Sequence, residues 1–169
     1  KDLINADYNV GPYAGFRYGD LSLLTRLYHQ SSHLGDEYVL REQITGGNRV
    51  NLSYEAVDLL LSLELPRGLR LYGGGGYLIS TDPKGLEPGI GQYGVEWRAS
   101  FTLGGNSGVR PVFAADLQHR EENDWDADYS VRAGVQFEDP GRFSQRLALM
   151  LEYYEGRSPN GQFYTERIE

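Results

Sequence analysis

The chain contains no cysteine among its 169 residues, which excludes disulfides, thiolate metal sites and a cysteine nucleophile. Basic residues are also scarce, since 16 Lys and Arg stand against 24 Asp and Glu and the net charge is −8. Proteins that bind nucleic acid usually present a basic face or stripe, so the composition argues against a nucleic-acid partner. No apolar run approaches the roughly 18 residues that a membrane-spanning helix needs.

Glycine and tyrosine are abundant, with 22 and 13 residues, and this mixture is typical of strands joined by many turns. The length fits a single domain over residues 1–169. Because the chain starts at Lys1 rather than at methionine and stops in a polar stretch, we expect a piece of a longer protein. The domain is therefore expected to be incomplete at one or both ends.

Apolar and polar residues alternate with a period of two, which is typical of strands and not of helices. Over residues 125–137 the odd positions are Trp, Ala, Tyr, Val, Ala, Val and Phe, whereas the even positions are mostly polar or charged. Segment 4–18 follows the same pattern. Turn residues divide the rest, and the expected strands are 3–18, 21–32, 47–65, 69–81, 89–103, 109–121, 125–138 and 146–156, with another starting over 162–169.

These strands reach the length of about nine to eleven residues that crosses a bilayer, and aromatic residues cluster near their ends. Mostly tight turns alternate with longer loops. We predict an all-β fold, an antiparallel up-and-down transmembrane β-barrel of at least eight strands in the bacterial outer membrane. Its apolar residues would face membrane lipids and its charges the lumen. The alternative is a soluble, lipocalin-like barrel with the apolar residues inside.

His29 and Ser31 are the most unusual pair in the chain. Residues two apart on a strand point to one face, about 6.5–7 Å apart. Their face is the apolar one, shared with Leu27, so in the membrane interpretation a histidine and a serine point toward lipid. A polar pair there costs free energy unless it is partnered, and a histidine beside a serine can activate the hydroxyl as a nucleophile.

A third group must orient the histidine, and the next expected strand offers Asn48 and Asn51. The apolar phase of this strand changes between Ala56 and Val57, which predicts a β-bulge within the strand. The position of the bulge decides which asparagine faces outward beside His29. Counting back from the turn at Pro66 favours Asn51. Ser53 and Glu55 share its phase and could form a polar patch, which would serve catalysis, bind metal or line the lumen.

Two resemblances follow from these motifs. The segment His29-Gln-Ser31-Ser32-His33, with Asn48-Arg49, resembles the His-x-Ser-Asn-Gly and Asn-Arg motifs of outer-membrane phospholipase A. That family is a twelve-stranded barrel with a Ser–His–Asn triad on its outer surface, needs calcium and acts as a dimer. The whole chain more closely resembles a bacterial outer-membrane family known as domain of unknown function 1207, in segments 29–38, 51–61, 122–125 and 158–163.

The phospholipase resemblance implies that Ser31 is the nucleophile and His29 the base. The orienting residue would be Asn48, by its arginine neighbour, or Asn51, by its distance from the turn. Ser32-His33 replaces the Asn-Gly of that family. A backbone N–H near Leu34 or Gly35 would then receive the oxyanion.

The same resemblance implies a calcium ion and a homodimer. Asp36, Glu37 and Thr45 are candidate calcium ligands, because calcium binds six to eight oxygen atoms. This family's strand that supplies one ligand has no counterpart in the chain, so the alternative is a protein without a cofactor.

Two classes of function remain open. The first is a phospholipase A-like serine esterase that acts on membrane lipids. The second is a non-enzymatic outer-membrane barrel, either structural or passing small solutes, in which His29, Ser31 and Asn51 form a structural cluster or bind lipid headgroups.

Overall fold

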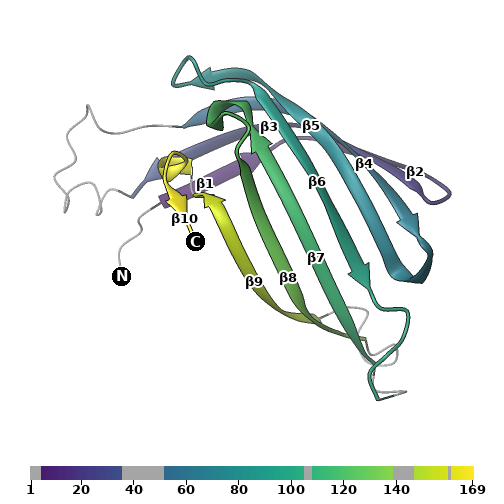
Figure 1. The fold of residues 1–169 in the computed structure, drawn as a ribbon. Coiled ribbons are helices and arrows are strands. Elements are labelled where there is room, and N and C mark those ends of the chain that lie inside the picture. Colours follow the sequence, from purple (N-terminus) through teal and green to yellow (C-terminus); the bar gives the residue numbers. More distant parts are fainter. Residues whose placement is uncertain (1–4, 36–51, 105–107, 139–146, 160) are drawn as a thin grey trace.

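The computed structural model describes residues 5–35, 52–104, 108–138, 147–159 and 161–169. Its strands follow the predicted segments closely (Figure 1). The described segments contain no helix with the length and apolar surface that crossing a bilayer requires. The strands are β1 (Asn5–Val10), β2 (Tyr13–Tyr18), β3 (Leu21–Leu34), β4 (Ser53–Leu65), β5 (Leu69–Asp82), β6 (Gly89–Arg98), β7 (Val109–Arg120), β8 (Ala127–Phe137), β9 (Leu147–Arg157) and β10 (Arg167–Ile168).

All ten strands belong to one antiparallel sheet, and from β2 onward each strand pairs with the next along the chain. β1 and β2 both pair with β3 in one continuous register, from Asn5 opposite Leu34 to Tyr18 opposite Leu21. They are therefore a single strand interrupted at Gly11 and Pro12. The Leu27 N–H still donates to the Pro12 carbonyl across the interruption, at 3.1 Å.

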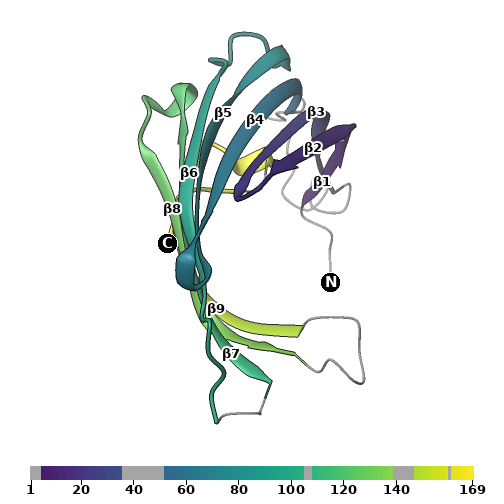
Figure 2. The same cartoon turned by 90° about the vertical axis from the view of Figure 1, so that its right-hand side faces the viewer.

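The sheet curls into a half-barrel, with β1 and β2 at one end of the curve and β9 at the other (Figure 2). This confirms the predicted all-β, antiparallel, up-and-down architecture. The convex side of the sheet is called the outer face here, and the concave side the inner face.

The outer face is apolar over most of its area. Leu61 and Leu151, for example, expose 46% and 83% of their surfaces there. A folded soluble protein rarely exposes a contiguous apolar patch larger than a few hundred Å². The strand pairing brings many such residues together on this face, among them Leu59, Leu61, Leu63, Leu71, Val131, Phe137, Leu149 and Leu151.

Aromatic residues border this aliphatic surface at both ends of the strands. Toward one rim the outer face bears Tyr77, Tyr93, His119, Trp125, Tyr129 and Tyr153, and toward the other Tyr18, Trp97, Phe113 and Phe137. His119 joins the first group by stacking on Tyr93 at 5.4 Å between ring centroids. Two aromatic belts around an aliphatic band are the pattern of membrane barrels.

The inner face is polar and its charges are paired across neighbouring strands. Arginine and carboxylate stand directly opposite each other in three pairs, with N–O distances of 2.5, 2.8 and 2.7 Å: Arg26–Asp58, Arg70–Glu96 and Arg132–Glu152. Each pair is partly exposed, so it stabilises the sheet by at most about 1 kcal/mol. Their main effect is to fix the register of the strands.

The structure differs from the sequence-based prediction at the bulge. β4 keeps one register with β3 from Ser53 to Leu63, so no extra residue lies in β4. The shift occurs between β4 and β5, where Glu55 faces Ser80 but Ala56 faces Leu78. The extra residue is therefore Ile79 in β5. The apolar phase changes in β4 because Tyr54 and Ala56 are buried on the inner face, in a small cluster with Leu78.

The end of β6 also differs from the prediction. The strand stops at Arg98 rather than continuing to residue 103, and Leu103 forms only an isolated bridge to Val109. Arg110 donates to the Ala99 carbonyl at 2.5 Å, so a side chain satisfies the backbone where the strand pairing stops.

Gly94 makes room on the inner face for a contact that crosses a whole strand. The Tyr72 hydroxyl of β5 reaches Asp116 of β7 at 2.5 Å, passing over β6. A Cβ on Gly94 would lie 2.4 Å from the Tyr72 hydroxyl and 2.5 Å from the Ala115 carbonyl oxygen. Only glycine fits at this position without displacing the tyrosine or the backbone of β7.

We expect Gly94→Ala to lower the free energy of unfolding by about 1–3 kcal/mol, the usual cost of overpacking. The matched control is Gly91→Ala on the same strand, because the nearest atoms to its Cβ would be 3.9 Å away. Urea titration of both variants in detergent measures the difference. Equal stabilities would show that the Tyr72–Asp116 contact does not constrain β6.

Residues after β9 cross the inner side of the sheet at one rim. The short 3-10 turn η3 (Gly161–Phe163) contacts β1 and β3. The Gly161 N–H donates to Asp7 at 3.3 Å, and Asp7 also accepts a hydrogen bond from the fully buried Ser32. This turn therefore connects the two edges of the half-barrel at that rim.

Candidate functional site

The predicted His29 and Ser31 lie on the outer face of β3, two residues apart, as the alternation predicts. Glu55 of β4 stands directly opposite His29, and Ser53 stands directly opposite Ser31. Ser80 of β5 stands opposite Glu55. These five residues, His29, Ser31, Ser53, Glu55 and Ser80, are called the outer polar patch.

The position of the outer polar patch follows from the pairing of the strands. It lies near the last residues of β3 and the first of β4, close to one rim. One step further into the sheet, Leu27 and Val57 stand opposite each other, and both are exposed apolar residues. The patch is therefore a polar group of side chains at the edge of an apolar surface.

A hydrogen bond between His29 and Glu55 organises the patch. The Nδ1 atom of His29 lies 2.9 Å from Oε1 of Glu55. A carboxylate at this distance favours the tautomer in which Nδ1 carries the proton, which leaves the Nε2 lone pair free to accept one. The side chains are 42% and 47% exposed, so the pair remains accessible from outside the sheet.

Ser31 forms no hydrogen bond with His29 or Glu55 among the described residues. Within the described part of the chain, its hydroxyl makes no contact of hydrogen-bonding length with His29. Catalytic hydrogen bonds are often long or poorly aligned before substrate binds, and they tighten in the complex with substrate.

The other predicted site residues are placed as follows. Leu34 is the last residue of β3, with Asn5 as its Cα partner, and the buried Gly35 follows it. The orienting candidates and the calcium-ligand candidates lie outside the described residues, and these are Asn48, Asn51, Asp36, Glu37 and Thr45. Among the described residues, no group of three His, Asp or Glu side chains could hold a metal ion.

Sequence analysis did not identify Glu55 as the partner of His29, although it placed Glu55 in a polar patch. The reason is the long connection between β3 and β4, which leaves their register undetermined by turn geometry. Once the register between β3 and β4 is known, the alternation alone pairs His29 with Glu55.

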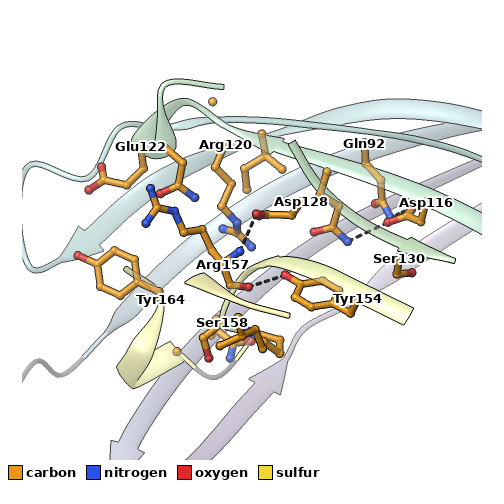
Figure 3. A pocket seen from close by; sticks show the side chains of 18 of the residues that line it. Gln92, Asp116, Arg120, Glu122, Asp128, Ser130, Tyr154, Arg157, Ser158 and Tyr164 are labelled. Carbon is orange, nitrogen blue, oxygen red and sulfur yellow. Dashed lines mark hydrogen bonds between the residues drawn. The ribbon is translucent and has the colours of Figure 1, made fainter. Parts of the chain in front are cut away.

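The inner face contains a second polar region, a cavity of about 710 Å³ (Figure 3). Asp116 in this cavity accepts hydrogen bonds from Tyr72 at 2.5 Å, Gln92 at 2.9 Å and Gln118 at 3.2 Å. Tyr164 lines it from the C-terminal segment, and burial raises the pKa of this phenol above its usual value. Sequence analysis did not single out this cavity, because its residues come from strands far apart in the chain.

The fold and these two polar regions define an antiparallel β-sheet protein curled into a half-barrel, with an apolar outer face and a polar inner face. The family model described as Protein of unknown function (DUF1207) matches residues 1–169, so the chain belongs to this family. The predicted resemblance to that family is confirmed. No curated protein and no solved structure matched the chain.

Proposed function

We propose that this chain forms the wall of a β-barrel in the bacterial outer membrane, with its outer face against lipid. The observation that supports this most strongly is the distribution of side chains between the two faces. Aliphatic residues between two aromatic belts lie outside, and the paired arginines and carboxylates lie inside. A soluble barrel requires the opposite distribution.

The energetics favour the same proposal. Apolar surface exposed to water costs about 25 cal/mol per Å², and Leu147, Leu149 and Leu151 are each more than two-thirds exposed, at 69%, 68% and 83%. In a bilayer this cost disappears, whereas charges in the lumen keep their partners and water. Between neighbouring strands the backbone hydrogen bonds are also made within the protein, as lipid requires.

Flotation with phospholipid vesicles tests this proposal. The chain, diluted from urea into vesicles, should float with the lipid and give a folded band in SDS that shifts on boiling. In a bacterium that exports the chain, the protein should sediment with the outer membrane. A chain that stays monomeric and folded in water without detergent would contradict the proposal.

A second candidate function is hydrolysis of a lipid ester at the outer polar patch, and the His29–Glu55 hydrogen bond of 2.9 Å favours it. The patch lies near a rim of the sheet, and in the proposed barrel this rim lies at the depth of the lipid ester groups. In this proposal Glu55 orients the imidazole, the role first predicted for an asparagine. Ser31 is the nucleophile, because it shares the face of His29 and lies two residues from it.

The proposed reaction has two steps. Oγ of Ser31 attacks the acyl carbonyl carbon while Nε2 of His29 takes the hydroxyl proton, and that proton then passes to the oxygen of the leaving lysolipid. Water next attacks the acyl carbonyl carbon of the acyl-serine ester while His29 takes its proton. His29 returns that proton to Oγ of Ser31 as the ester bond breaks, and the fatty acid leaves. A backbone N–H near Leu34 or Gly35 is the proposed donor to the oxyanion.

Calcium and a homodimer remain proposals that come from the phospholipase resemblance. The candidate ligands lie outside the described residues, so the proposed steps use only the protein's own side chains. Labelling by a fluorophosphonate in mixed micelles tests whether Ser31 is reactive. Comparison of samples with calcium and with a chelator tests whether that reactivity needs calcium. We expect label on Ser31; failure to label in both conditions would favour the non-enzymatic barrel.

A further inference from the structure

The inner cavity differs in character from the rest of the inner face. Most of that face is lined by paired charges, but one wall of the cavity is apolar. Leu52, Tyr54 and Leu78 are each more than nine-tenths buried, and Ile90 and Tyr164 pack against them. All five line the cavity of about 710 Å³, a volume typical of sites for small organic ligands.

Two arginines face the same cavity. Arg120 is the last residue of β7 and Arg157 the last of β9, and in Figure 3 both side chains extend into the space beside Asp128. The Arg120 guanidinium donates to no acceptor within the described part of the chain. An arginine that faces a cavity without an acceptor is a ready partner for an anion.

Arg157 adds a second donor without an acceptor. Its Nη1 donates to the Thr165 carbonyl at 2.6 Å, but its Nε is buried and has no partner in the described structure. A buried polar group without a partner costs about 1–3 kcal/mol. A ligand that supplied an acceptor would remove part of this cost.

The nearby carboxylates already have donors. Asp128 accepts the Arg157 backbone N–H at 2.7 Å, and Glu122 accepts the Glu87 backbone N–H at 2.8 Å. Deeper in the cavity, Glu152 is paired with Arg132 at 2.7 Å. The donors that lack an acceptor at this site are therefore those of Arg120 and Arg157, and the carboxylates of Asp116, Glu122 and Asp128, which also line the cavity, accept hydrogen bonds from neutral donors.

We propose that the inner cavity binds a small organic anion that has an apolar tail, such as a short-chain carboxylate. The carboxylate accepts hydrogen bonds from Arg120 and Arg157, and the tail lies against Leu52, Leu78 and Ile90. This site is separate from the outer polar patch, so it does not depend on the proposed ester hydrolysis.

Three probes of equal chain length test the proposal: hexanoate, hexylammonium and hexanol. Each is titrated into the folded protein in nanodiscs, with empty nanodiscs as the blank, and binding is followed by saturation-transfer NMR. We expect hexanoate to bind with a Kd on the order of 1 mM, the range for so few atoms. Hexylammonium and hexanol should bind at least about 10-fold more weakly, because neither accepts from two guanidinium groups.

The variant Arg120→Gln distinguishes this site from binding elsewhere. We expect it to weaken hexanoate binding at least about 10-fold, the usual effect of losing a charge-assisted hydrogen bond. The matched control is Arg70→Gln, which removes an inner-face arginine that pairs with Glu96 and does not line the cavity. Both variants must retain the folded band in SDS.

Two results would overturn the proposal. One is tighter binding of hexylammonium than of hexanoate, which would assign the cavity to cations. The other is equal hexanoate binding by wild type, Arg120→Gln and Arg70→Gln.

Discussion

Leu61→Arg is expected to destabilise the protein in phospholipid vesicles by about 2–4 kcal/mol, the cost of an arginine on the lipid face of a membrane barrel. Leu61 lies on the outer face of β4, between the two aromatic belts, and is 46% exposed. In water an arginine at so exposed a position would cost almost nothing. The substitution therefore separates lipid from water as the solvent of this face.

The matched control is the next residue along the chain, Leu60. It faces the inner side, where Leu24 and Gly74 are its neighbours across the sheet. Leu60→Arg should cost less than about 1 kcal/mol, since the lumen of a barrel accepts polar groups. Denaturant titration in vesicles compares the two variants, and a Leu61→Arg protein as stable as wild type would count against a lipid-facing wall.

Ser31→Ala is expected to reduce hydrolysis of a phospholipid ester at least about 10³-fold, because removing the nucleophile of a serine hydrolase leaves only binding and oxyanion stabilisation. The measurement is fatty-acid release from mixed micelles of phospholipid and detergent. The matched control is Ser53→Ala, since Ser53 faces Ser31 directly on the neighbouring strand. That variant should retain activity within a few-fold.

Variants of Glu55 test its proposed positioning role. Glu55→Gln retains an oxygen that can accept from Nδ1 of His29 and should keep more activity than Glu55→Leu, which has no acceptor. Equal activity in wild type and Ser31→Ala would leave the patch without a catalytic role.

The alternation of residues was sufficient to predict the fold. It defined the strands because one buried or lipid-covered face demands a period of two, and tight turns such as Gly19-Asp20 set the boundaries. It also placed His29 and Ser31 on one face. The alternation could not state which face of a curved sheet is concave, because that depends on the sense in which the whole sheet bends.

Side-chain contacts between strands could not be predicted from the sequence. The pairing of His29 with Glu55 depends on a register that a long connection leaves open. The bulge was misplaced because burial of Tyr54 and Ala56 on the inner face imitates a change of phase. The inner cavity is lined by residues from β3 to β10 and could not be predicted from any local sequence pattern.

Tryptophan fluorescence in vesicles of brominated lipids tests the central proposal most directly and requires no substitution. The chain has two tryptophans, and Trp97 and Trp125 lie in opposite aromatic belts on the outer face. Bromine atoms near the headgroup end of the acyl chains should quench both strongly, and bromine atoms deep in the bilayer less. Emission that is insensitive to bromine at every depth and is quenched by aqueous iodide would contradict a lipid-facing wall.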